Sequence, residues 1–144
     1  MKHIVFAAAL AVATPVLAGE TPAPEGATVY FANIEDGAVV SSPVTVVFGL
    51  SGMGVAPAGT EMEMTGHHHV LLDRPPLGEG DFGEEEFDLA IPSDENHLHF
   101  GGGQTEISIA LVPGEHTLQL VLGDHNHVPH VPPVVSEVIT ITVE

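Results

Sequence analysis

Short runs in which apolar and polar residues alternate are the feature that most limits how this chain can fold. The clearest runs lie at 105–111, 116–122 and 134–143. An alternation with period two is typical of a strand that is buried on one face. Gly and Pro interrupt every window in which an amphipathic helix of useful length could form. The sequence therefore predicts an all-β domain.

The number and spacing of the strand-like runs indicate a sandwich of two sheets. We expect seven short strands, at 28–34, 44–50, 67–73, 86–91, 105–111, 116–122 and 134–143. Turn residues such as Glu35-Asp36-Gly37 and Pro113-Gly114 separate them. About seven strands with turns between them are typical of an immunoglobulin-like or fibronectin-like β-sandwich. We therefore assign residues 28–144 to a single domain of this class.

The first 18 residues have the pattern of a cleavable signal peptide. Met1-Lys2-His3 supplies a charged start, a short apolar run follows, and Val16-Leu17-Ala18 suits cleavage after Ala18. A membrane-spanning helix is disfavoured because Thr14-Pro15 interrupts the apolar run, which is shorter than the ~20 residues needed to span a bilayer. Residues 19–27 are small, polar and Pro-rich, as in a flexible lead-in. The protein is therefore expected in the periplasm or outside the cell, with no membrane insertion after signal removal.

The charge and the absence of cysteine exclude several classes of function. The chain holds 2 Lys and Arg against 20 Asp and Glu, so its formal net charge is −18. Such an acidic surface repels nucleic acid and attracts cations without selectivity. The chain has no Cys, so disulfides, thiolate catalysis and thiolate metal sites are absent. His, Met, Asp and Glu remain as possible metal ligands.

Eight of the ten histidines fall into three clusters. They are the triplet 67–69, the pair His97 and His99, and the group His125, His127 and His130. In a seven-stranded Greek-key sandwich the second, fourth and sixth connections gather at one end of the domain. The expected strands place all three clusters at that end, whereas His116 follows the fifth connection and belongs at the opposite end. The sequence therefore predicts a histidine-rich metal site with His116 outside it.

The spacing within the clusters indicates which imidazoles share a side. His67 and His69 alternate with His68 along a strand, as His97 and His99 alternate with Leu98, so each outer pair points one way. Neutral imidazole suits copper, zinc and nickel. The candidate metal ligands are His67, His69, His97, His99, His125, His127 and His130, with His69, His99, His127 and His130 expected as the inner ones. Met62, Met64 and His68 are possible additional ligands, and thioethers beside imidazoles would favour copper over zinc.

Each cluster also has an ordinary structural explanation. A histidine triplet can be the polar start of a strand, Asp124 and Asn126 favour turns, and methionines can cover the end of a core. We therefore keep two functions: a metal-binding domain, with copper favoured over zinc, and a non-metal interaction module of the cell envelope. An enzyme is not expected, because no Gly-x-Ser-x-Gly elbow occurs and Gly101-Gly102-Gly103 is not followed by the Lys of a phosphate loop. Copper redox activity is the enzymatic alternative.

Several motifs in a fixed order resemble the family DUF4399. They are Gly-His-His-His-Val-Leu-Leu-Asp at 66–73, His-Leu-His-Phe-Gly-Gly-Gly-Gln-Thr-Glu at 97–106, Pro-Gly-Glu-His-Thr-Leu-Gln-Leu at 113–120, Gly-Asp at 123–124, His-Val-Pro-His at 127–130 and Pro-Pro-Val at 132–134. The resemblance covers roughly residues 28–144 and includes His116. It implies a small exported bacterial domain and a periplasmic setting, and it implies no activity. The metal hypothesis therefore rests on spacing and topology alone.

Overall fold

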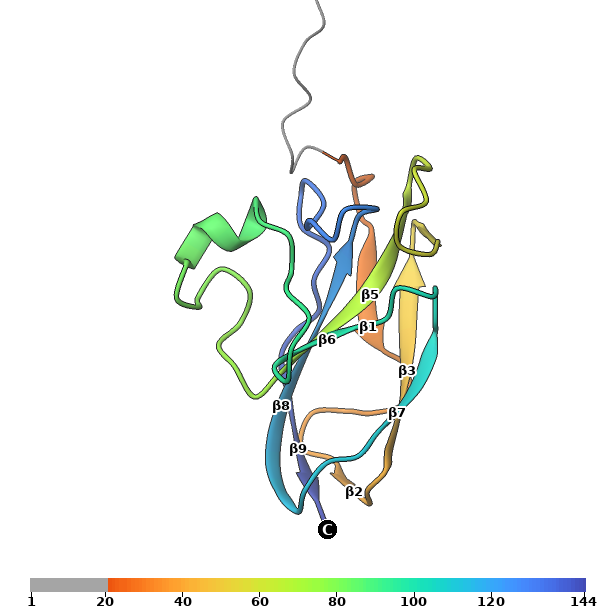
Figure 1. Ribbon diagram of the computed structural model, residues 1–144. Helices are drawn as coiled ribbons and strands as arrows, with labels where there is room; N and C mark the ends of the chain where they lie inside the picture. Colours follow the sequence, from red (N-terminus) through yellow and green to blue (C-terminus); the bar gives the residue numbers. More distant parts are fainter. Residues whose placement is uncertain (1–20) are drawn as a thin grey trace, which may run out of the picture.

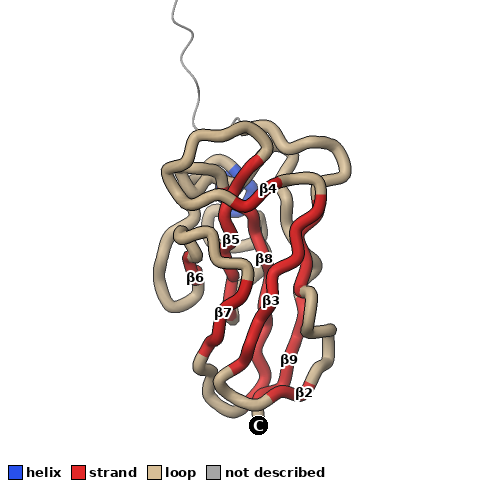
Figure 2. The backbone as a smooth tube through the Cα atoms, turned by 90° about the vertical axis from the view of Figure 1, so that its right-hand side faces the viewer, coloured by secondary structure: helices blue, strands red, loops and turns tan. Residues whose placement is uncertain are grey.

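The computed structural model describes residues 21–144, which form two stacked β-sheets (Figures 1 and 2). The smaller sheet has the order β1 (Thr28–Phe31), β3 (Val44–Ser51), β7 (Glu106–Ile109). The larger sheet has the order β2 (Val39–Val40), β9 (Ile139–Val143), β8 (Gly114–Gly123), β5 (Thr65–Leu72), β4 (Gly54–Val55), and β6 (His97–His99) also pairs with β5. The predicted all-β sandwich is confirmed. The signal-like residues 1–18 lie outside the described part of the chain.

The main core lies between the two sheets and follows from the alternation in the sequence. Alternate residues of β3, β5, β8 and β9 point inward, and the buried set includes Val46, Val70, Leu118, Leu120, Leu122 and Ile141. Burying apolar side chains of this size is worth about 1.5–3 kcal/mol each. These side chains also determine which residues of β5 and β8 face away from the core.

The outward face of β5 and β8 is covered as well, by the segment 73–96. Leu71 and Val121 point outward and pack against Leu77 and Ile91 in a second apolar cluster. The Gln119 side chain reaches out from β8 and its Oε1 accepts a hydrogen bond from the backbone N–H of Leu77 at 2.9 Å. In Figure 1 the segment forms the green excursion beside β5 and β8. This cover explains why β5 and β8 are buried along most of their length.

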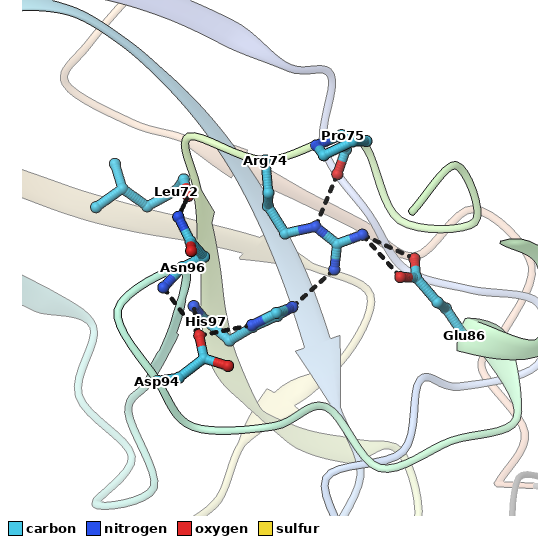
Figure 3. A network of polar contacts seen from close by, with 7 residues as sticks. All are labelled: Leu72, Arg74, Pro75, Glu86, Asp94, Asn96 and His97. Carbon is cyan, nitrogen blue, oxygen red and sulfur yellow. Dashed lines mark hydrogen bonds and ion pairs between the residues drawn. The ribbon is translucent and has the colours of Figure 1, made fainter. Parts of the chain in front are cut away.

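The prediction of a strand at 86–91 is wrong. Gly83–Phe87 is a short 3-10 helix, η1, and the residues after it form no strand. Glu86 accepts hydrogen bonds from Arg74 at 2.8 and 2.9 Å (Figure 3). It also accepts one from the backbone N–H of Gly78 at 2.8 Å, so the carboxylate folds the segment onto itself. The next strand is β6, which pairs with β5, and the predicted loop containing His97 and His99 is therefore an edge strand.

The other six predicted strands are present with shifted ends. The last begins at Ile139, because the Pro132-Pro133 segment and an irregular stretch precede it. At the other end of the described chain, Ala23 donates to the carbonyl of Val131 at 3.0 Å, and Val131 donates to Thr21 at 3.0 Å. Part of the expected lead-in therefore lies against the domain. Within residues 21–144, no helix has the length and apolar character needed to cross a membrane.

Gly66 offers a test of the close contact between β5 and β8. A Cβ at this position would lie 2.6 Å from the carbonyl oxygen of Gly123 and 2.9 Å from Cε1 of His130. We expect Gly66→Ala to lower the free energy of unfolding by about 1–3 kcal/mol, as overpacking does elsewhere. Gly54→Ala on β4 is the control, because its Cβ would meet nothing closer than 3.5 Å. Urea denaturation measures both, and equal stability of the two variants would contradict this account.

Candidate metal centre

Four histidines from three segments of the chain form one compact group. His67 and His69 lie on β5, His99 lies on β6 and His127 lies in the loop between β8 and β9. One ring nitrogen from each lies within 4.8 Å of those of the other three. The Nε2 atom of His67 is 3.0 Å from both Nε2 of His69 and Nδ1 of His127. We call these four residues the four-histidine group.

The register of the strands brings the first three imidazoles together. His67 and His69 are two residues apart, so both rings project from the outward face of β5, as predicted. His99 is the direct partner of His69 in the β5–β6 pairing. Directly opposed residues of an antiparallel pair have Cβ atoms only about 4.5–5.5 Å apart. The pairing therefore places the His99 ring beside that of His69, with ring centroids 5.1 Å apart.

Two glycines lie against the imidazole rings, where a residue with a Cβ would overlap them. Gly123 pairs with His67 across β5 and β8, and a Cβ there would lie 2.7 Å from Nε2 of His69. A Cβ on Gly101 would lie 2.4 Å from Cε1 of His99 and 2.5 Å from its Nε2. The four-histidine group therefore has glycine backbone against two of its imidazoles.

A tight turn in the β8–β9 loop presents the fourth imidazole. Asp124 is 2 % exposed, and its Oδ1 accepts hydrogen bonds from the N–H groups of Asn126 and Val128 at 2.8 and 2.9 Å. Its Oδ2 accepts from the Thr21 hydroxyl at 2.6 Å. His127 has a positive φ of 68°, a conformation that non-glycine residues adopt rarely. Asp124 therefore holds the turn that directs His127 toward β5.

The hydrogen bonds to Asp124 keep its carboxylate charged. Burial alone would raise the pKa of Asp124, but hydrogen bonds from Thr21, Val128 and Asn126 outweigh burial and hold the pKa below its usual value. One buried negative charge therefore lies close to the four-histidine group without belonging to it. The sequence indicated a turn at Asp124 but not this electrostatic role, because the bond to Thr21 joins residues 103 positions apart.

Three imidazoles of the four-histidine group, those of His67, His69 and His99, favour the neutral form. Burial, followed by repulsion from His127 and His99, lowers the pKa of His67 to about 4. Burial and repulsion from the neighbouring imidazoles lower the pKa of His69 to about 2. The same effects, burial first, lower the pKa of His99. At neutral pH these three rings therefore carry lone pairs rather than charge, as metal binding requires.

Hydrogen bonds among the imidazoles cannot satisfy all of their nitrogens. Within the described chain, Nδ1 of His67, Nδ1 of His69 and Nε2 of His99 are buried and have no hydrogen-bond partner. A neutral imidazole has one N–H. When the proton of His67 is on Nε2, Nδ1 is a hydrogen-bond acceptor without a partner. When the proton is on Nδ1, Nδ1 is a donor without a partner. An unsatisfied buried polar group costs about 1–3 kcal/mol. The nitrogens without a partner therefore lower the free energy of unfolding of the metal-free protein.

The donor set suits a borderline or soft transition metal. Tetrahedral coordination with metal–nitrogen bonds of 2.0–2.1 Å requires nitrogens about 3.3 Å apart. The contacts of 3.0 Å in the group and its limit of 4.8 Å bracket this value. The group contains no carboxylate, so Ca²⁺ and Mg²⁺, which prefer oxygen ligands, fit it poorly. The geometry is therefore compatible with one copper or zinc ion.

Three of the seven histidines proposed as ligands lie outside the group. His97 accepts a hydrogen bond from Arg74 at 2.7 Å and donates to Asp94 at 2.8 Å (Figure 3). His125 lies on the outer side of its loop, with Nε2 2.8 Å from the side-chain nitrogen of Asn126. His130 is buried, with each ring nitrogen 3.2 Å from a backbone carbonyl, one of Leu122 and one of Thr65. His67 therefore takes the place in the group that the sequence suggested for His130.

The three possible additional ligands also lie elsewhere. His68 points into the sandwich, where its ring lies 4.8 Å from that of Phe48 and its Nδ1 donates to the carbonyl of Gln104 at 3.3 Å. Its Nε2 is buried and has no partner in the described chain. Burial lowers the pKa of His68, and the bond to Gln104 opposes this. Met62 and Met64 are exposed on the connection before β5 and are not part of the group.

His116 lies far from the group, as the topology predicts. It is seven residues from Gly123 along β8, or roughly 23 Å at 3.3 Å per residue. Its Nε2 donates to the carbonyl of Val112 at 2.9 Å, and its Nδ1 lies 2.7 Å from Oδ2 of Asp73. The hydrogen bond to Val112 and then that to Asp73 raise the pKa of His116. This histidine ties the end of β5 to β8 and has a structural explanation.

The buried imidazoles predict that the metal-free protein loses stability as the pH falls. In the unfolded chain His67 and His69 take up protons near pH 6.5, whereas the folded protein resists protonation until about pH 4 at His67 and about pH 2 at His69. The free energy of unfolding should therefore fall by about 2 kcal/mol for each of these two histidines between pH 7 and pH 5.

Urea denaturation in the presence of a chelator at pH 7, 6 and 5 measures this effect. His67→Asn/His69→Asn is the comparison, because it removes both titrating rings and leaves the carboxylates, which stay mostly ionised in this range. We expect its stability to depend much less on pH than that of the unchanged protein. The same dependence in both proteins would show that these rings are not held neutral.

The chain was compared with known families and proteins. Residues 46–144 match the family described as "Domain of unknown function (DUF4399)". The match extends from β3 to the end of the chain, and it includes all four members of the four-histidine group. No curated protein and no solved structure matches the chain. Because the match spans more than half of the chain, this protein belongs to the DUF4399 family.

Proposed function

We propose that this protein is an exported metal-binding domain whose four-histidine group holds one copper ion, with zinc as the second choice. The observation that carries the proposal is the convergence of four imidazole nitrogens within 4.8 Å of one another. Three of the rings have lowered pKa values, so their lone pairs are free of protons at neutral pH. His68 also has a lowered pKa, but its ring does not belong to the converging set. A cation at the centre of the group would bind the lone pairs of these four converging nitrogens.

The preference for copper rests on the donor atoms. For a given nitrogen site, divalent copper binds more tightly than zinc in the Irving–Williams order. The sequence favoured copper because thioethers stood near the histidines, but Met62 and Met64 are not members of the group. Four imidazoles also suit zinc. We therefore expect the group to bind both metals and to bind copper more tightly.

We place the protein in the periplasm or outside the cell. The signal pattern of residues 1–18 supports export, and a histidine site without thiolates suits an oxidising compartment. The acidic surface disfavours nucleic acid as a partner. An envelope protein that delivers or receives the metal fits a binding domain of this kind. We propose no catalytic activity, since the proposal needs no substrate, and copper redox activity is the enzymatic alternative.

A surface cavity supports an interaction module as the alternative function. The cavity measures about 420 Å³ and lies in the cover segment 73–96, lined by apolar residues that include Phe82, Leu89 and Ile91. Its polar lining includes Arg74 and Glu86, which form an ion pair at 2.8 Å. Figure 3 shows this ion pair. Apolar walls with a few polar groups are typical of binding pockets. This alternative predicts a partner recovered by pull-down from envelope extracts and no stoichiometric metal in the purified protein.

Removing two members of the four-histidine group tests the metal proposal. We expect protein purified without a His tag to bind one equivalent of Cu²⁺, and to bind Zn²⁺ more weakly. His99→Ala/His127→Ala should lower the Cu²⁺ affinity by more than about 100-fold, since losing even a supporting residue of a metal site costs 10- to 100-fold. Competition against a chelator of known affinity measures the change.

The matched control is His97→Ala/His116→Ala, which also removes two histidines. His97 is two residues from His99 on β6, and His116 lies on β8, but neither belongs to the group. We expect this variant to keep the Cu²⁺ affinity even where its stability falls. The metal proposal fails if both double variants bind Cu²⁺ equally well.

Gly101 tests whether the position of the His99 ring matters. A Cβ at Gly101 would overlap the imidazole and force it to move. We expect Gly101→Ala to lower Cu²⁺ affinity by about 10- to 100-fold, as displacement of a ligand's support does. The control is Gly102→Ala, whose Cβ would come no closer than 3.1 Å to a flexible glutamine side chain. Equal affinities in the two variants would argue against His99 as a ligand.

A further inference from the structure

We propose that Met62, Met64 and His125 form a second metal site on the surface, selective for soft monovalent cations such as Cu⁺ and Ag⁺. These three side chains line one cavity of about 460 Å³, together with Glu61, Glu63, Thr21 and Pro22. None of them belongs to the four-histidine group. The surface site does not rest on the proposed function.

Met62 and Met64 are among the exposed large hydrophobic residues of the domain. Met62 is 62 % exposed and Met64 is 55 % exposed, whereas Met53 packs against the main core. Hydrophobic side chains that stay accessible next to one another often mark a binding surface. Here both thioethers open onto the same cavity as an imidazole. The arrangement leaves their sulfur atoms available to a ligand from solution.

The backbone that carries the methionines is held in place. The hydroxyl of Thr65 donates to the carbonyl of Met62 at 2.8 Å, and the N–H of Gly54 donates to the carbonyl of Met64 at 2.9 Å. Met64 has a positive φ of 55°, a conformation that is rare outside glycine and that often occurs at functional sites. The segment is therefore a defined turn into β5, and it presents the two side chains from positions two residues apart.

The donor atoms of this cavity differ from those of the four-histidine group. Thioether sulfur is a soft ligand that suits Cu⁺ and hardly suits Zn²⁺. Glu61 adds negative charge, with its Oε1 3.8 Å from Nε2 of His125. The acidic side chains attract cations in general, and the sulfur atoms select the soft ones. Two thioethers and one imidazole therefore specify a soft monovalent ion.

A single turn separates the two sites. His125 and His127 belong to the same turn, with His125 facing the cavity and His127 belonging to the four-histidine group. The carbonyl of His125 accepts a hydrogen bond from Gly59 at 3.0 Å, which joins this turn to the methionine-bearing connection. Thr21, which lines the cavity, bonds to Asp124 at the base of the same turn. The two sites therefore share one turn of the backbone.

The surface site can be tested with Ag⁺, which mimics Cu⁺ without redox chemistry. Protein labelled with ¹³C at the methionine ε-methyl groups is washed with chelator and titrated with Ag⁺. We expect the signals of Met62 and Met64 to shift and that of Met53 to stay. Met62→Leu/Met64→Leu should lose at least about tenfold in Ag⁺ affinity at this site, because it removes the soft ligands and keeps the apolar volume. Met53→Leu, the control, should not.

The His99→Ala/His127→Ala variant separates the two proposals. Shifts of Met62 and Met64 that persist in this variant support the surface site on its own, even if the four-histidine group proves not to bind metal. Unmoved Met62 and Met64 signals in the unchanged protein, or Ag⁺ affinity unaffected by Met62→Leu/Met64→Leu, would overturn the surface site.

Discussion

The pairing of β5 with β8 and β6 is the constraint on which the candidate site depends. In this register Val70 and Leu72 face the main core, and His67 and His69 therefore face outward. A shift by one residue would turn these two histidines into the core and expose the two apolar residues. The hydrophobic stabilisation of Leu118, Leu120 and Leu122, which are fully buried opposite them, opposes such a shift. The apolar residues of the sandwich therefore also determine the positions of the imidazoles.

Burial has opposite effects on the stability of the domain and on its capacity to bind a cation. The cover segment 73–96 and the turn at Asp124 exclude water from imidazole nitrogens that have no protein partner, which destabilises the metal-free fold. The same burial holds the pKa values of His67 and His69 low, so protons compete weakly for their lone pairs. A cation bound at the converging nitrogens would stabilise the folded state, because only the folded chain brings these nitrogens together. The positive φ of His127 also costs free energy in the folded state.

The local part of this arrangement could be predicted from the sequence, and the long-range part could not. Alternation and residue composition identified six of the strands, and alternation assigned His67 and His69 to one face and His68 to the other, because such patterns depend only on neighbouring residues. The position of His99 depends on its pairing with His69, thirty residues earlier in the chain, and no local pattern encodes that register. The wrong strand at 86–91 has a similar cause, since the bonds of Glu86 to Arg74 and Gly78 outweigh local strand propensity. His127 was predicted in the group together with His130, but His130 is held by the carbonyls of Leu122 and Thr65, and no local pattern reveals these contacts.

The acidic surface acts on cations over long distances, whereas the proposed nitrogen and sulfur ligands act only in direct contact with the ion. A formal charge of −18 attracts every cation, and over distances longer than about 10 Å salt screens much of this attraction. It therefore raises local ion concentration but cannot distinguish copper from calcium. Discrimination requires donor atoms in direct contact with the ion, and in this chain the carboxylates stay outside the four-histidine group while nitrogen alone faces its centre. Because Asp124 is buried beside the group without joining it, its charge would offset that of a cation bound there and would leave the ligand chemistry to imidazole.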